Sequence, residues 1–140
     1  MIPIGSGDET AGVEPAEAAG LEVLALVGAS ALMTPLLDEL RRAGLRVDIA
    51  ADLPTARTLF FGSGGHDCLL VAPDVVPALA KQVLRSLRGV APELATASFS
   101  RAVLAEESPL RAARLGAYHP GSRAAVGAVL RFLQRLTPTR

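Results

Sequence analysis

Few residues of this chain could do chemistry, and they do not cluster along the sequence. The 140 residues include two histidines, His66 and His119, and a single cysteine, Cys68. A histidine can sense pH or bind a metal ion, but a metal site built on His119 would have only His66 to complete it. The relative positions of these two residues therefore decide whether a metal site is possible.

The run from Asp67 to Asp74 (DCLLVAPD) is the stretch around which the other elements are arranged. A short apolar run bounded by turn signals predicts a strand buried on both faces of a parallel sheet. Cys68 is then a small core side chain. Open parallel sheets carry their chemistry just beyond the C-terminal ends of the strands. At that point this strand has Ala72 and Pro73, and neither has a reactive group.

The glycine-rich segment Gly62–Gly65 (GSGG) has the composition of a phosphate-binding loop. Such loops follow a strand and open a helix, because amides at the helix N-terminus bind the phosphate. This segment follows a predicted helix and precedes the buried strand, so we expect it at the opposite edge of the sheet. His66 shares that edge and lies far from His119. The sequence therefore predicts no phosphate loop, no metal site and no bound cofactor.

The elements that must position these residues alternate between strand and helix. The predicted strands are Leu21–Val27, Leu45–Ala50, Asp67–Val71, Leu94–Ser98 and the very short Ala117–His119. The predicted helices begin at or just after Thr34, Asp52, Asp74, Ser108 and Ser122, of which all but Ser108 are predicted N-caps. Five strand–helix units predict a three-layer α/β sandwich of the flavodoxin-like class. Its parallel five-stranded sheet has the order 2-1-3-4-5, with irregular fourth and fifth units.

Composition favours one globular domain preceded by a polar segment. Hydrophobic residues make up 50% of the chain and the formal net charge is zero, which favours a packed core and no nucleic-acid partner. Residues 1–20 are predicted to be a flexible acidic tail, and residues 21–138 the folded domain. Residues 1–22 carry five acids and no base, whereas residues 101–140 carry seven arginines and two glutamates. The tail could instead dock on a partner or on the basic C-terminal half.

Three further features predict a cytoplasmic protein without a membrane partner. A single cysteine forms no internal disulfide and is typical of a reducing compartment. No apolar run approaches the ~20 residues that a membrane helix needs. The N-terminus lacks the basic and apolar regions of a signal peptide.

Several short motifs occur along the chain in a recognisable order. They are Leu40–Gly44, Asp67–Val71, Thr96–Ala97, Gly116–Ala117 and His119–Pro120. In this order and spacing they make residues 21–136 similar to the receiver domain of bacterial response regulators. Receivers accept a phosphoryl group on an aspartate at the end of the third strand.

The receiver reaction needs four kinds of residue: two acids that hold Mg²⁺, the acceptor aspartate, a lysine and a hydroxyl. The resemblance places Val27 and Gly28 at the positions of the two acids, and Ala72 at that of the acceptor aspartate. His119 stands at the position of the lysine, and the hydroxyl position falls on Thr96, Ser98 or Ser100. Asp74 could enter the site only through a shift that breaks the strand pattern, and it is predicted to cap a helix instead. The resemblance therefore implies a pseudo-receiver, with the fold kept and the catalytic residues gone.

We expect a phosphorylation-independent protein–protein interaction module in bacterial two-component signalling or regulation. The alternative is a module that binds a small ligand or nucleotide in a crevice at Gly28, Ala72 and Thr96. An enzyme is not expected. Val27–Ser30 resembles the opening of short-chain dehydrogenases, but the later glycines of that motif and a Tyr-x-x-x-Lys motif are absent.

The last two predicted helices and the strand between them form the predicted interaction face, which receivers commonly use. At about 100° per residue, Phe132 lies roughly a quarter-turn from the inward stripe of the last helix. An aromatic side chain among alanines, bordered by arginines, has the composition of an interface. Alternatively, Phe132 only seals the edge of the core. The predicted face, for a protein partner or a second copy, comprises Arg111, Arg114, Tyr118, Arg123, Ala128, Arg131, Phe132 and Arg135.

Overall fold

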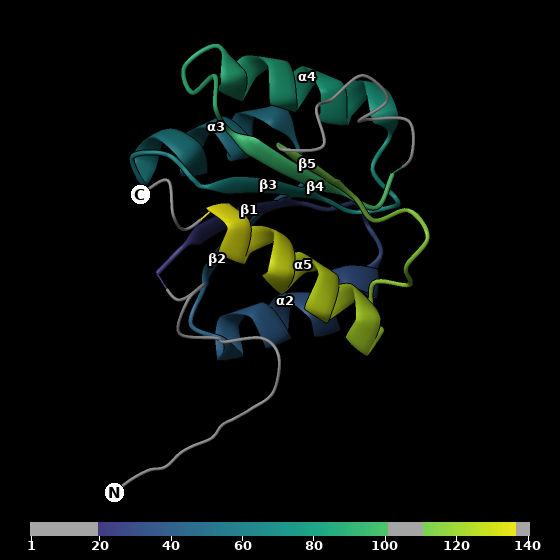
Figure 1. Ribbon diagram of the computed structural model, residues 1–140. Coiled ribbons are helices and arrows are strands. Elements are labelled where there is room, and N and C mark those ends of the chain that lie inside the picture. Colours follow the sequence, from purple (N-terminus) through teal and green to yellow (C-terminus); the bar gives the residue numbers. More distant parts are fainter. Residues whose placement is uncertain (1–19, 101–110, 137–140) are drawn as a thin grey trace, which may run out of the picture.

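A computed structural model of the chain describes residues 20–100 and 111–136 (Figure 1). Within them lies a five-stranded, wholly parallel sheet in the order β2-β1-β3-β4-β5. The predicted fold class and strand order are thereby confirmed. The strands are β1 (Glu22–Leu26), β2 (Arg46–Ala50), β3 (Cys68–Val71), β4 (Ala95–Ser98) and β5 (Ala112–Arg114). The helices are η2 (Ala31–Met33, a 3-10 helix), α2 (Thr34–Arg42), α3 (Leu53–Gly62), α4 (Pro77–Arg88) and α5 (Arg123–Leu136).

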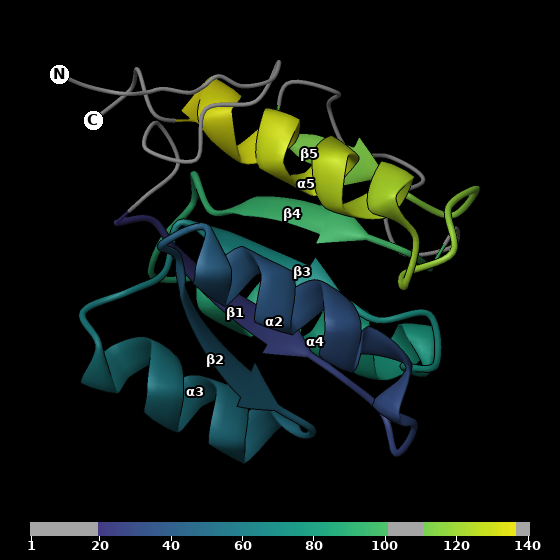
Figure 2. The ribbon, with the colours of Figure 1, turned by 90° about the horizontal axis from the view of Figure 1, so that it is seen from below.

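Helices cover both faces of the sheet and give the molecule three layers. The pair α3 and α4 packs on one face, and the pair α2 and α5 on the other (Figure 1). Figure 2 shows α5 at the β4–β5 end of the sheet and α2 nearer to β1. The four residues of β3 are at most 1% exposed, because this strand lies in the middle of the sheet and under both helix layers. Its apolar run is the sequence signature of that position.

Helix starts follow the predicted caps in two of four cases. Asp52 accepts a hydrogen bond from the Thr55 amide at 2.8 Å, and the Ser122 hydroxyl accepts one from the Ala125 amide at 3.1 Å. Both predictions are confirmed. Thr34 is not a cap, because the 3-10 turn η2 begins before it and makes Thr34 the first residue of α2. Asp74, the fourth predicted cap, is described with the site below.

The fifth strand lies earlier in the chain than predicted. The predicted helix from Ser108 to Gly116 is wrong where the structure describes it, because Ala112–Arg114 form β5. The predicted strand Ala117–His119 is also wrong, since these residues belong to the loop before α5. An Ala-Ala-Arg segment has no intrinsic preference for a strand. It becomes one by pairing with β4, with Ala97 opposite Ala113.

Residues 1–19, 101–110 and 137–140 lie outside the described residues. The prediction of a tail over residues 1–20 therefore stays a prediction. The described hydrophobic core extends from Leu21 in front of β1 to Leu133 in α5. No helix in the described part of the chain is long and apolar enough to cross a membrane.

Candidate functional site

The loops that follow β1 and β3 meet at the carboxylate of Asp74. It accepts hydrogen bonds from the backbone amides of Gly28 at 3.1 Å and Ser30 at 3.0 Å. The predicted capping role of Asp74 is therefore wrong: the N-cap position of α4 is Val76, and no side chain caps it. Because α4 begins at Pro77, Asp74 lies two residues before the N-cap and bonds to a different loop.

Gly28 is required by this contact. A Cβ atom on Gly28 would lie 2.6 Å from both Cγ and Oδ2 of Asp74. Amides in such a loop are the donors that a bound anion would use, and here a side chain of the protein itself uses two of them. Asp74 reaches the edge without any shift of β3, since Ala72 continues the ladder by donating to the Leu26 carbonyl at 2.9 Å.

The other positions of the implied phosphorylation site are apolar or turned away from this edge. Val27 is half-buried, and Ala72 is fully buried. Thr96 is also fully buried and lies two residues before the end of β4, where it accepts a hydrogen bond from Arg88 at 3.3 Å. The hydroxyl at the end of β4 belongs to Ser98, which accepts from the Ser100 amide at 2.9 Å.

His119 lies in the exposed loop between β5 and α5. Its Nδ1 accepts a hydrogen bond from the Gly121 amide at 3.0 Å, so this ring nitrogen serves the loop itself. Of the five implied positions, the structure places Gly28 in direct contact with a carboxylate. Ala72 and Thr96 have no exposed surface through which a ligand could reach them.

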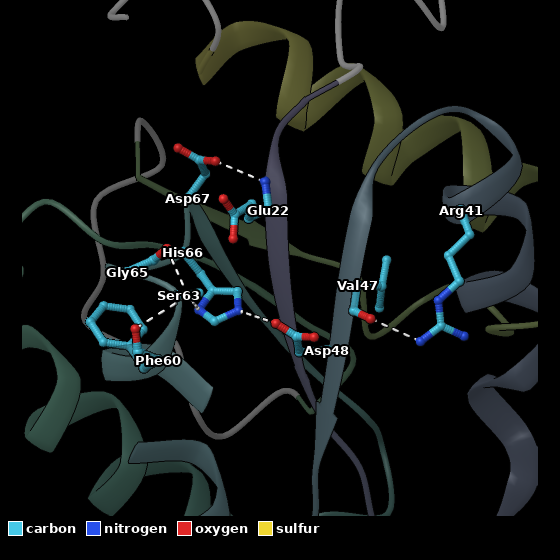
Figure 3. A network of polar contacts seen from close by, with 9 residues as sticks. All are labelled: Glu22, Arg41, Val47, Asp48, Phe60, Ser63, Gly65, His66 and Asp67. Carbon is cyan, nitrogen blue, oxygen red and sulfur yellow. Dashed lines mark hydrogen bonds and ion pairs between the residues drawn. The ribbon is translucent and has the colours of Figure 1, made fainter. Parts of the chain in front are cut away.

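A polar network that the sequence did not predict lies at the opposite edge, where the strands begin (Figure 3). The Nε2 atom of His66 is 2.8 Å from Oδ2 of Asp48 in β2, and its Nδ1 is 3.4 Å from the Ser63 hydroxyl. The ring stacks on Phe60 of α3 with 5.6 Å between the centroids. The His66 side chain is fully buried. It thus links the edge strand β2 to α3 and to the start of β3.

A serine, a histidine and an aspartate in a row can activate the serine hydroxyl, but this arrangement is structural. The Ser63 hydroxyl is 3.3 Å from the Phe60 carbonyl and 3.2 Å from the Gly65 carbonyl. These two acceptors compete with His66 for the single hydroxyl proton. No part of the imidazole is exposed to a substrate. Within the described residues, no group of three or more His, Cys, Asp or Glu could hold a metal ion.

The glycine-rich segment belongs to this same edge, as predicted. Gly64 and Gly65 have φ values of +80° and +106°, a conformation that glycine adopts without steric cost. They turn the chain from α3 into β3 and so set His66 against Asp48. The sequence carried no distinct signal for this network, because Asp48 alternates with Val47 and Ile49 just as Arg46 does. Nothing in the sequence paired Asp48 with His66.

A groove of about 820 Å³ lies between β5 and α5. Six of the eight residues of the predicted interaction face line it: Arg114, Tyr118, Ala128, Arg131, Phe132 and Arg135. These six residues therefore lie together, with Arg114 on β5 and not on a helix, and their role as an interaction face stays a prediction. We call this feature the β5–α5 groove.

Phe132 contributes to the base of the β5–α5 groove. Phe132 is only 2% exposed and belongs to the buried core, which agrees with the alternative in which it seals the edge of the core. The guanidinium carbon of Arg135 lies 5.5 Å from the centroid of its ring. Arg131 and Arg135 are exposed, and Tyr118 is 37% exposed. The groove thus has a floor of half-buried alanines with Phe132 buried beneath it, and a rim that carries Tyr118, Arg131 and Arg135.

The two remaining residues of the predicted face lie elsewhere. Arg111 precedes β5 and donates a hydrogen bond to the Pro92 carbonyl. Arg123 is the first residue of α5 and lines a separate groove of about 790 Å³ between α5 and α2. The basic surface of the C-terminal part is therefore divided between two grooves.

Comparisons with known proteins bear on the fold. No protein-family model matches the chain, and no curated protein sequence matches it. Among solved structures, the chain is similar to one described as a fusion that carries the trimeric coiled coil of yeast Spc42. The TM-score is 0.57 at 13% identity, over 81% of this chain and 77% of that one. Such a likeness shows the fold alone. The flavodoxin-like α/β class rests on the parallel sheet with the order β2-β1-β3-β4-β5.

Proposed function

We propose that this chain is a protein–protein interaction module whose β5–α5 groove receives a partner without a phosphorylation step. The observation that carries the proposal is the composition of the groove. The half-buried Ala128 and the partly exposed Tyr118 supply apolar surface, and Arg131 and Arg135 supply a basic rim, as in the core and rim of protein interfaces. The receiver-like motifs favour a cytoplasmic, bacterial signalling or regulatory setting for such a module.

The ends of the strands support the same proposal over a small-ligand site. Two amides that an anion would use are already bonded to Asp74. Ala72 and Thr96 are fully buried, so a ligand at this edge would find neither. A partner at the β5–α5 groove needs none of these groups.

Affinity capture with matched charge reversals tests the proposal. Arg131→Glu inverts a charge at the rim of the groove, and Lys81→Glu inverts one on the exposed side of α4, on the other face of the sheet. We expect Arg131→Glu to lose the captured partner and Lys81→Glu to retain it, with both variants melting at the wild-type temperature. Equal capture by both variants would contradict the proposal.

A second measurement addresses the phosphorylation step. Incubation with Mg²⁺ and acetyl phosphate, followed by intact mass measurement, should give no adduct, since Ala72 has no nucleophile. Asp74 is the nearest acid in sequence, but its carboxylate is bonded to two amides. A stoichiometric adduct that disappears in Asp74→Asn would overturn this part of the proposal.

A further inference from the structure

Residues 1–19 and the β5–α5 groove carry opposite charges. Residues 1–19 contain Asp8, Glu9, Glu14 and Glu17 and no lysine or arginine. Residues 20–140 therefore carry all 14 basic residues against the other ten of the 14 acids. Among the described residues, Arg131 and Arg135 of the groove have no ion-paired carboxylate. The groove thus combines uncompensated positive charge with apolar surface.

The position of Gly20 puts the N-terminal segment within reach of the groove. Its amide donates to the Gly44 carbonyl at 3.2 Å, which fixes it at the edge where the strands begin. Helix α5 runs antiparallel to the strands, so Arg135, near its C-terminal end, lies toward the same edge (Figure 2). Three strand spacings, roughly 14 Å, separate β1 from β5. A segment of 19 residues can span up to roughly 60 Å.

The charge of the groove discriminates between possible occupants. A second copy bound through the same surface would set Arg131 and Arg135 against arginines, because a two-fold interface repeats one patch on both sides. An acidic segment would instead form charge-assisted hydrogen bonds with them. Ile2 and Ile4 offer apolar side chains for the floor of the groove. Covalent attachment gives such a segment an effective concentration of millimolar order.

We propose that residues 1–19 dock in the β5–α5 groove of their own chain, with their acids against Arg131 and Arg135. The proposal rests on the proposed function in that both concern this groove. A segment that occupies the groove in cis competes with the partner. Neutralising its four acids should therefore increase partner capture.

Paramagnetic relaxation in the full-length protein tests the docking directly. Cys68 is the one cysteine of the chain and is 1% exposed, so a nitroxide can be attached selectively in the variant Ser6→Cys. We expect the amide signals of Ala113, Arg131 and Arg135 to lose intensity, while that of Lys81 keeps it. The loss should disappear at about 1 M salt, where the screening length is about 3 Å. It should also disappear in Arg131→Glu with Arg135→Glu and persist in Lys81→Glu.

Three results would overturn the docking. The first is unaltered amide signals at the groove, and the second is a loss that the double reversal leaves unchanged. The third is an equally strong loss in a mixture in which one copy carries the nitroxide and the amides of another copy are observed. That result would show that the segment docks between copies. Loss of partner capture in Arg131→Glu without docking would refute this inference alone. Docking with capture insensitive to Arg131→Glu would refute only the proposed function.

Discussion

The Asp74 carboxylate bonds to amides that are 46 and 44 residues away in the sequence, those of Gly28 and Ser30. A local pattern of an aspartate before a helix indicates a cap, and no local pattern could indicate this distant pairing. The absence of a side chain at Gly28 was the one trace of it in the sequence. At the residue scale, the contact joins two loops and uses the donors of the edge where related folds bind ligands.

Gly28→Ala should destabilise the protein, because the new Cβ would lie 2.6 Å from Asp74 and a loop must move. We expect a loss of about 1–3 kcal/mol, measured as a lower urea midpoint with an unchanged slope. Gly62→Ala is the control, since a Cβ at Gly62 has no atom within 4 Å and alanine favours a helix. The double variant Gly28→Ala with Asp74→Ala should recover part of the loss. No recovery would place the conflict elsewhere.

Cys68 should be inert in the native protein. Burial raises the pKa of its thiol from 9.0 to about 12, so the folded state favours the protonated form. The stability that this raised pKa contributes is fully present below pH 9 and is lost as the pH rises from 9 toward 12. At neutral pH, a thiol-exchange reagent should react with Cys68 only as fast as the protein unfolds. The variant Thr58→Cys, on the exposed side of α3, should react at once. Equally fast reaction of the wild-type thiol would show that β3 opens in the native state.

At the scale of elements, the strands differ in how far the sequence predicts them. β1 and β3 are apolar runs, because helices cover both of their faces. β5 has no such signal, and its three residues become a strand only through pairing with β4. Because the fifth strand was predicted too late in the chain, Phe132 was also predicted to lie on an exposed face of the last helix, whereas Phe132 is buried. The helical pattern named most of the residues that line the groove, but it could not give the groove's shape.

Helix caps provide a matched test at this scale. The Ser122 hydroxyl accepts from the Ala125 amide at the start of α5, so Ser122→Ala should cost about 0.5–2 kcal/mol of unfolding free energy. Thr34→Ala should cost close to nothing by comparison, because Thr34 is exposed and already inside α2. Chemical denaturation of both variants measures the difference. Equal losses would show that Thr34 also caps a helix.

Across the whole molecule, the two edges of the sheet have different roles. Where the strands begin, the buried contacts of His66 with Asp48 and Phe60 hold β2 and α3 to the sheet. Where the strands end, Asp74 joins the first and third loops. Both edges thus carry contacts that hold parts of the fold together. The β5–α5 groove lies beside the sheet and can accept a partner without breaking either set.

Deleting residues 1–19 should leave the fold intact, because the described core begins at Leu21, which is 2% exposed. Surface ion pairs contribute about 0–1 kcal/mol each, and 1 kcal/mol shifts the melting temperature by about 2–8 °C in domains of this size range. With Arg131 and Arg135 each losing one such pair, at most about 2 kcal/mol in all, we expect the melting temperature, followed by circular dichroism, to fall by less than about 16 °C. Deletion of residues 1–23 is the control, since it also removes Leu21 and Val23 from the core, and it should abolish cooperative unfolding. If the shorter deletion alone did so, residues 1–19 would be part of the folded core and not a segment that docks on it.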